Sequence, residues 1–319
     1  MLGAAILGAS GYSGQEMLDR ILRHPDLEAV ALGSDSLAGE PASALDVRLN
    51  GSLPRFVPND EALAAGADVV FLCLGNERAA LVEPPEDAVV IDLSGVHRLA
   101  VPEVALRHYP AAPGPWSYGL PELAPPEGRL IANPGCYATA ALLALGPLSD
   151  ALVAGSVVID GKSGVSGAGR ELKPSSQAGF VLENLSPYRV GTHQHAPEIA
   201  QVLGLPVCFV PHLLPVRRGL LATCYAEVQD DARELLEAAY ASSPVVRVLP
   251  EGVAPGLARV QHTDEAEIGI FEDRATGRTV VVCALDNLGK GAAGQALQNA
   301  NLALGLEEPA GLRLSGVLV

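Results

Sequence analysis

The stretch Leu2-Gly3-Ala4-Ala5-Ile6-Leu7-Gly8-Ala9-Ser10-Gly11-Tyr12-Ser13-Gly14 decides the class of fold. Residues 2–7 are apolar and predict a short strand, and the spacing of apolar side chains in residues 17–22 predicts a helix directly afterwards. Glycines between a strand and a helix let backbone N–H groups approach a phosphate at the helix N-terminus. A tight turn without a ligand would use the same glycines, and their spacing is not the common dinucleotide-binding form. Their place directly after the first strand favours a nucleotide site.

Further strands are predicted at residues 28–32, 68–74 and 89–93, alternating with helices. This alternation predicts an α/β fold in which a parallel sheet with crossover helices forms a Rossmann-type nucleotide domain. The pattern changes after Cys136, where apolar segments are separated by long loops. These segments predict an α+β domain with a mostly antiparallel sheet, its strands at residues 156–159, 206–210, 220–227 and 279–285.

The order of these segments predicts two domains. A helix expected over residues 288–304 has apolar positions spaced for packing back onto the first domain. We therefore expect residues 1–135 and 287–319 to form an NAD(P)-binding domain. Residues 136–286 are expected to form the domain for catalysis, substrate binding and oligomerisation.

The composition indicates a globular protein with a large core, since 49% of the 319 residues are hydrophobic and 18% are charged. The net charge of −16 argues against nucleic acid and anionic membranes as partners. Five cysteines without the spacing of a disulfide framework indicate a reducing compartment. No apolar stretch is interpreted as membrane-spanning, so we expect a cytoplasmic protein.

Cys136 lies in the segment that narrows the function most. Pro134 and Gly135 force a turn before it and residues 138–145 are strong helix formers, so the thiol is expected at a helix N-terminus. Unpaired N–H groups and the helix dipole gather there and favour the thiolate. A buried, inert thiol is the alternative. We expect the remaining cysteines to be buried, inert thiols: Cys73, Cys208, Cys224 and Cys283.

The segment His193-Gln194-His195-Ala196-Pro197-Glu198-Ile199 predicts an acid/base group. Pro197 fits the first turn of a helix that runs to about Leu203, which places His195 just before the helix and Glu198 one turn away. A histidine that is oriented by a carboxylate is what nucleophilic cysteine catalysis needs. A hydrogen-bonded core histidine and a metal site are the alternatives, although no further ligand cluster accompanies the pair. The other histidines, His24, His97, His108 and His262, are expected at the surface or in turns.

Several features could bind anions or a ribose. Residues 160–170 combine glycines with Lys162, Ser166 and Arg170 directly after a predicted strand, which suits an anion, although a flexible loop is the alternative. His212 and Arg218 are further cationic candidates. Asp35, at the end of the second predicted strand, could accept hydrogen bonds from a ribose 2′-hydroxyl and so favour NAD over NADP. A solvated turn carboxylate is the alternative there.

Taken together, these segments resemble the N-acetyl-γ-glutamyl-phosphate reductases, enzymes of arginine biosynthesis that are related in fold to aspartate-semialdehyde dehydrogenase. The resemblance runs from Gly8 to about Leu306. Besides the segments already quoted, it includes Val90-Ile91-Asp92-Leu93-Ser94, Tyr118-Gly119-Leu120-Pro121-Glu122-Leu123, Glu183-Asn184-Leu185-Ser186-Pro187-Tyr188, Phe209 to Thr223 and Asp286 to Gln295.

The resemblance implies reductive dephosphorylation of an acyl phosphate with NADPH, through a thioester on Cys136. It assigns acid/base work to His195, positioning of His195 to Glu198, and closure over the nicotinamide side to residues 287–294. It implies a homodimer or homotetramer and no metal. The residues assigned to substrate and phosphate are Asn133, Lys162, Ser166, Arg170, His212 and Arg218. Those assigned to the cofactor are Gly8, Ser10, Gly11, Tyr12, Ser13, Gly14, Ser34, Asp35, Ser94, Gly167, Asn287 and Lys290.

The sequence departs from the family pattern at four places. Asp35 and Glu40 stand where basic residues are common, which leaves NAD(H) open beside NADP(H). Residues 74–77 replace a Pro-His-Gly turn, and Gln194 replaces an arginine between the histidines.

Other functions remain open at this stage. The same chemistry could act on aspartyl phosphate, or on an aminoadipyl or glutamyl phosphate carried by an acidic protein, to which an acidic reductase is a poor match. A cysteine hydrolase would use Cys136 and His195 without a nucleotide. A nucleotide-sensing binding protein would keep the glycine loop and lack catalysis.

Overall fold

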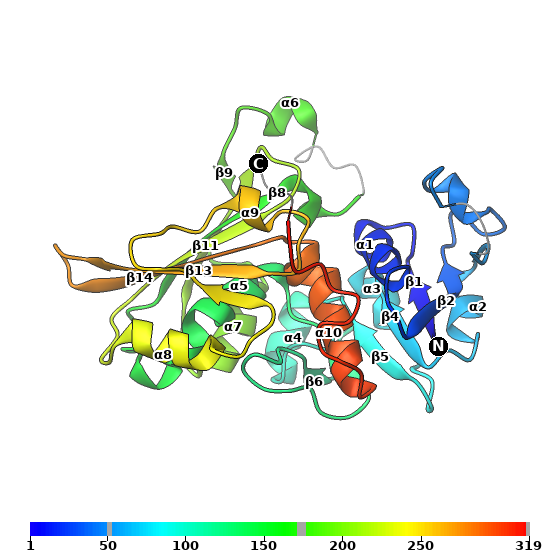
Figure 1. Cartoon of the computed structure of the whole chain (residues 1–319), viewed down its shortest axis with the longest axis horizontal. Coiled ribbons are helices and arrows are strands. Elements are labelled where there is room, and N and C mark those ends of the chain that lie inside the picture. The colour runs from blue at the N-terminus through cyan, green and yellow to red at the C-terminus, as the bar shows by residue number, and fades with distance from the viewer. Residues whose placement is uncertain (50–52, 171–176, 317–319) are drawn as a thin grey trace. The chain divides into compact units, whose positions relative to one another are not determined.

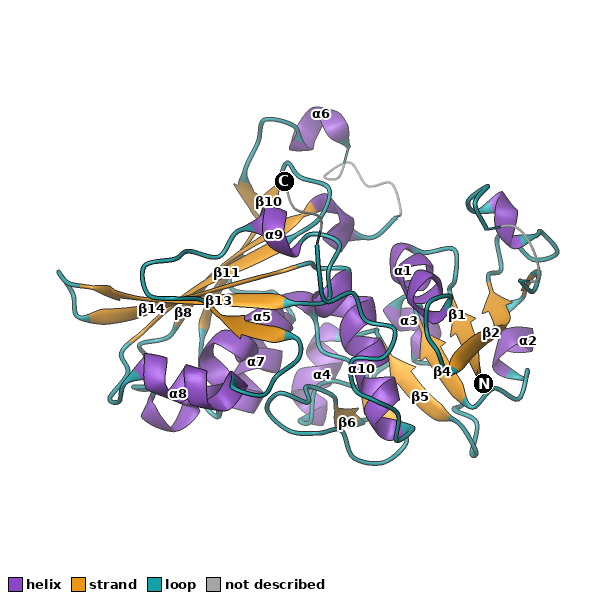
Figure 2. Cartoon of the chain, in the orientation of Figure 1, coloured by secondary structure: helices purple, strands orange, loops and turns teal. Residues whose placement is uncertain are grey.

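The computed structural model describes residues 1–49, 53–170 and 177–316. The expected domains also take in residues 50–52, 171–176 and 317–319, which lie outside the described residues. The chain forms two compact units. Unit 1 contains Met1–Pro134 and Ala292–Leu312, and unit 2 contains Gly135–Gly291 and the segment from Arg313 onward. Figure 1 labels the elements along the chain and Figure 2 separates helices from strands.

Unit 1 is built on a seven-stranded sheet in the order β3-β2-β1-β4-β5-β7-β6. Every neighbouring pair in this sheet is parallel. The predicted Rossmann-type sheet is therefore confirmed, and its order changes direction between β1 and β4, where such folds bind nucleotides. The strands are β1 (Leu2–Leu7), β2 (Leu27–Gly33), β3 (Phe56–Val57), β4 (Val69–Leu72), β5 (Val89–Asp92), β6 (Ser117–Tyr118) and β7 (Leu130–Ala132).

The helices of unit 1 cover this sheet. Helix α1 (Tyr12–Ile21) follows the glycine loop and buries Met17, Leu18 and Ile21, as predicted, whereas Leu22 lies past the helix end and is exposed. Helix α10 (Gly294–Ala303) packs against β5 and α1. The remaining helices are α2 (Asn59–Leu63), α3 (Asn76–Ala79), α4 (Pro102–His108) and a 3-10 turn at Ala42–Ala44.

Unit 2 is built on a second seven-stranded sheet in the order β12-β13-β14-β11-β8-β10-β9. Four of its pairs are antiparallel and two are parallel, which confirms the mostly antiparallel prediction. Its strands are β8 (Val158–Gly164), β9 (Ser186–Pro187), β10 (Cys208–Leu214), β11 (Leu220–Ala226), β12 (Val246–Val248), β13 (Ala266–Asp273) and β14 (Arg278–Leu285). Its helices are α5 (Cys136–Leu145), α6 (Ala178–Val181), α7 (His195–Leu203), α8 (Ala232–Tyr240) and α9 (Leu257–Val260), with 3-10 turns at Gly146–Ala151 and Val165–Ala168.

Helix α5 is the central helix of unit 2. It packs on β11, β14 and α7, and residues 137–145 are all buried. A helix that is apolar on every side is stable only where protein surrounds it. The Cys136 end of this helix is thereby held in one place.

Two strands of unit 2 extend further than predicted. Strand β8 runs to Gly164, beyond the predicted end at Ile159, because β10 and β11 pair with it on both sides. Tertiary pairing here outweighs the low strand propensity of glycine, and a Cβ at Gly161 would lie 2.6 Å from the Tyr137 ring. Likewise β10 continues to Leu214. Lys162 and His212 therefore lie in strands and not in loops.

Among the described residues, no helix is long and apolar enough to span a membrane.

Candidate active site

Cys136 is the first residue of α5, and Gly135 is the N-cap. The prediction that the thiol stands at a helix N-terminus is confirmed, because the Pro134-Gly135 turn ends exactly where the helix-forming run begins. The backbone at Gly291 packs closely against Cys136: a Cβ on Gly291 would lie 2.8 Å from the Cβ of Cys136. Cys136 thus combines the positive end of a helix with partial exposure of the residue.

Burial disfavours the thiolate at three of the other cysteines. Burial raises the pKa of Cys73 and Cys224, and it raises the pKa of Cys283 to about 12. The prediction that Cys208 is a core thiol is wrong, because this residue begins β10 with its side chain exposed. Alternation along a strand buries one side only, and the sequence did not show which side.

His195 and Glu198 are brought to the backbone that precedes Cys136. His195 begins α7, and its Nε2 lies 3.9 Å from Oε2 of Glu198. The Oε1 of Glu198, which is fully buried, accepts a hydrogen bond of 2.8 Å from the backbone N–H of Gly135. One carboxylate thus lies beside the imidazole and also holds the peptide next to the nucleophile.

Gly135 is required for this arrangement. A Cβ built on it would lie 2.2 Å from Nε2 of His195, so no larger residue fits while the imidazole keeps its place. The sequence predicts Gly135 only as a turn residue, whereas in the structure it donates to Glu198 and lies close to His195.

We expect Gly135→Ala to lower kcat by about 10²-fold or more, since displacing a catalytic group by about 1 Å has effects of this size. Gly179→Ala is the matched control, because a Cβ there meets nothing within 4 Å. The measurement is steady-state turnover of both variants, with thermal unfolding to show that both fold. Equal activity of the two variants would contradict the role given to Gly135.

Aromatic rings contact His193 and His195 at the start of α7. The His193 ring lies 4.7 Å from the His195 ring, centroid to centroid, and Nδ1 of His193 accepts a hydrogen bond from the backbone N–H of His195. Tyr137, Tyr188 and Phe209 contact His193 edge-on. Burial raises the pKa of both tyrosines, that of Tyr188 to about 12, so both phenols remain neutral near pH 7. His193 therefore holds the backbone at the start of α7 and lies next to His195.

Lys162 and His212 both lie beside the carboxylate of Asp160, for which the sequence predicted no role. Strands β8 and β10 pair so that His212 is the register partner of Lys162. Asp160, two residues before Lys162 and on the same face of β8, lies 2.6 Å from Lys162 Nζ, and its second oxygen lies 3.0 Å from His212 Nδ1. All three side chains are partly exposed. In this cluster, which we call the Asp160 cluster, the Lys162 amino group and the His212 imidazole stand at fixed positions where they can donate to an anion.

The remaining residues predicted to bind substrate or nicotinamide in unit 2 have structural contacts. Asn287 donates to Ser166 Oγ and accepts from the backbone N–H of Gly219. Arg218 is buried and its Nε donates to Asp286, at 2.6 Å. Lys290 is fully buried in the π-helix Gly289–Ala293. A Cβ on Gly167 would touch Ser163, and Arg170 is exposed. Their ligand contacts stay predictions.

The glycine loop of unit 1 fits a dinucleotide. Gly8 has a φ of +72°, and a Cβ there would lie 2.2 Å from the carbonyl oxygen of Cys73. A Cβ on Gly14 would lie 2.4 Å from the oxygen of Gly8. Only glycines allow such a close turn before α1, which leaves the backbone N–H groups at the helix start open to a pyrophosphate. Ser10, Tyr12 and Ser13 lie in this same loop and first turn.

The other predicted cofactor and substrate residues of unit 1 lie at the ends of its strands. Ser94 follows β5 and donates its hydroxyl to the buried Asp92, whose pKa is raised by burial. Asn133 is buried, donates to the backbone oxygen of Ala292 and accepts from Asn299 on α10. Asn133 thus fixes the chain just before the nucleophile.

Two of the histidines that were expected at the surface or in turns are buried. His97 is buried and stacks on Trp116 with ring centroids 3.8 Å apart, 4.0 Å from Asp92. His24 is buried and contacts Asn301 of α10. Both positions depend on partners distant in sequence.

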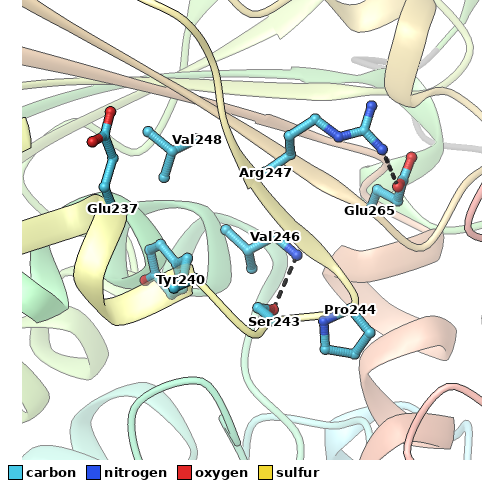
Figure 3. A pocket seen from close by; sticks show the side chains of 9 residues that line it. Glu237, Tyr240, Ser243, Pro244, Val246, Arg247, Val248 and Glu265 are labelled. Carbon is cyan, nitrogen blue, oxygen red and sulfur yellow. Dashed lines mark hydrogen bonds and ion pairs between the residues drawn. The ribbon is translucent and has the colours of Figure 1, made fainter.

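A cavity of about 390 Å³ lies elsewhere in unit 2, between α8 and β12 (Figure 3). Its walls include Tyr240 and the ion pair of Arg247 with Glu265, and none of its lining residues belongs to the predicted site. The cavity is therefore separate from the predicted site.

Both units match known domains. Residues 3–130 match the model of the semialdehyde dehydrogenase NAD binding domain, and residues 136–287 match that of the semialdehyde dehydrogenase dimerisation domain. Aspartate semialdehyde dehydrogenase II from Vibrio cholerae has the same fold, with a TM-score of 0.71, 19% identity and coverage of 96% of this chain and 98% of that one. Fold and site thus define an oxidoreductase of the semialdehyde dehydrogenase class with a nicotinamide-binding domain.

Proteins of similar sequence identify the family within this class. N-acetyl-gamma-glutamyl-phosphate reductases from Salinispora tropica and Acidothermus cellulolyticus are 44% and 45% identical to the chain, in each case over 98% of both sequences. The chain belongs to the N-acetyl-γ-glutamyl-phosphate reductase family.

Proposed function

We propose that the protein reduces N-acetyl-γ-glutamyl phosphate to N-acetylglutamate 5-semialdehyde and phosphate in arginine biosynthesis, with NADPH as the reductant. The observation that carries this proposal is the arrangement of Cys136 at the start of α5 with His195 and Glu198 at the start of α7. Their shared contact is the Gly135 peptide. Family membership supplies the substrate class.

The first half of the reaction is acyl transfer. The Cys136 thiolate attacks the carbonyl carbon of the acyl phosphate, and the carbonyl oxygen takes up the negative charge. Donors at the helix N-terminus favour that charge. The carbon–oxygen bond to phosphate then breaks, the carbonyl re-forms, and a thioester and free phosphate result. We assign the phosphate to Lys162 and His212 of the Asp160 cluster, together with Ser166 and Arg170.

The second half regenerates the thiolate. The glycine loop would hold a nicotinamide cofactor, which would supply a hydride to the thioester carbonyl carbon. His195 protonates the resulting hemithioacetal oxygen and later removes that proton, when the carbon–sulfur bond breaks and the aldehyde forms. Glu198 holds the imidazole in place through its fixed position against Gly135.

The test runs the reaction backwards with N-acetylglutamate semialdehyde, phosphate and NADP⁺, following absorbance of the reduced nicotinamide. We expect a signal that depends on phosphate and exceeds the signal with aspartate semialdehyde. A signal with aspartate semialdehyde alone would overturn the proposed substrate. No signal with either aldehyde would favour the carrier-linked substrate, and nucleotide binding without turnover would favour a sensor.

The match of residues 136–287 to a dimerisation domain further supports an oligomer. We propose a homodimer or homotetramer, which light scattering on the purified protein would distinguish from a monomer.

A further inference from the structure

An ion pair between Asp35 and Arg78 lies at the end of β2, and the reaction steps proposed above do not use it. Gly8 follows β1 and Ser34-Asp35 follow β2, and the two strands are parallel neighbours with Leu7 opposite Gly33. In a sheet of this order, the pyrophosphate binds at the loop after the first strand and the adenosine ribose at the end of the second. Asp35 therefore stands where a protein reads the ribose 2′ position.

Asn59 joins this position to the glycine loop. Its side-chain oxygen accepts a hydrogen bond of 2.8 Å from the backbone N–H of Gly8, and its own backbone N–H donates to Asp35 Oδ1 at 3.0 Å. The hydroxyls of Ser10 and Ser34 lie 2.8 Å apart, which gives a second connection between the two loops. Hydrogen bonds thus join the loops after β1 and β2 within unit 1.

Asp35 is already bound on both oxygens. The hydrogen bond from the Asn59 backbone holds the pKa of this carboxyl below its usual range, so it is anionic. Its Oδ2 accepts from Arg78 Nη2 at 2.9 Å. A carboxylate with both oxygens occupied has less capacity to accept a ribose hydroxyl, and its charge is balanced by the guanidinium.

Arg78 is positioned to offer its remaining donors. It lies on α3, whose first residue, Asn76, accepts a hydrogen bond of 2.9 Å from the backbone N–H of Gly95 and so fixes the helix start. A guanidinium has five N–H donors. Within the described residues Asp35 is its one side-chain partner, and the Arg78 side chain is 55% exposed. A planar fork of free donors beside the ribose position suits a phosphate dianion.

We propose that Arg78 is the residue that selects NADPH over NADH, by binding the 2′-phosphate from α3 while Asp35 orients the guanidinium. The inference rests on the proposed function, which supplies the nicotinamide cofactor. Asp35 alone would favour NADH over NADPH. The pair of Asp35 with Arg78 has the opposite effect, because it presents a cation where the sequence shows only an acid.

The test measures binding of two probes, 2′,5′-ADP and 5′-AMP, to the purified protein by calorimetry. We expect Arg78→Ala to weaken 2′,5′-ADP by about 10- to 100-fold, the size of a lost charge-assisted contact, with 5′-AMP changed by less than about twofold. Arg78→Lys keeps the charge and loses the fork, so it should fall between. Exposed ion pairs add little stability, so these variants should fold.

Arg23→Ala is the matched control, since Arg23 is an exposed arginine of the same unit that is also paired with an aspartate, Asp19. It should leave both affinities unchanged. Equal binding of 2′,5′-ADP by wild type and Arg78→Ala would overturn the assignment of Arg78 and leave the proposed reduction intact. Wild-type protein that binds neither probe would overturn both.

Discussion

Cys136→Ser is expected to lower turnover by about 10⁴-fold or more, the scale of losing a catalytic nucleophile. A serine hydroxyl at the start of α5 keeps the shape of the site but cannot ionise near pH 7, so no thioester forms. The variant should bind nucleotide as tightly as wild type, because the glycine loop belongs to a different unit. Steady-state turnover and calorimetric nucleotide binding measure the two effects separately.

Cys208→Ser provides the control, because Cys208 is an exposed thiol in the same unit. It should keep full activity. Retention of most activity by Cys136→Ser would exclude the thioester mechanism. Loss of nucleotide binding together with activity would mean that the substitution disturbs more than the nucleophile.

His195→Asn is expected to slow turnover by about 10²-fold or more, which is the usual contribution of a positioned acid/base group. Asparagine preserves polarity at the start of α7 but cannot exchange a proton with the hemithioacetal. The change should appear in kcat, and the dependence of kcat on pH should lose the limb that reports the imidazole.

His193→Asn is the comparison, because His193 accepts a hydrogen bond from the backbone N–H of His195 and contacts aromatic rings. It should have the smaller effect, with the pH profile retained. A larger loss from His193→Asn than from His195→Asn would mean that the acid/base role belongs to His193.

Local sequence signals located the elements that carry the chemistry. The helix that begins at Cys136 was predictable because a Pro-Gly turn precedes a run of strong helix formers. Helix α7 was predictable to its end at Leu203, since Pro197 fits its first turn and Gly204, with a φ of +69°, ends it. The strand-glycine-helix order of residues 2–14 likewise specified the nucleotide unit.

The ends of strands and their pairing were harder to predict from the sequence. The predicted end of β8 at residue 159 placed Lys162 in a loop, whereas pairing on both sides continues the strand through two glycines. A strand is predicted from alternating apolar residues. In β8 this alternation stops where the strand begins to carry the side chains of the predicted site.

The sequence by itself determined which chemical groups the protein has and which local element holds each of them: a thiol and an imidazole at helix starts, and glycines after the first strand. Only the tertiary structure decided their partners. Asp160 meets His212 across 52 residues through β8 and β10, and Asp35 meets Arg78 across 43 residues. Local periodicity follows from neighbours in the chain, whereas these contacts follow from strand register and helix packing, which depend on the whole fold.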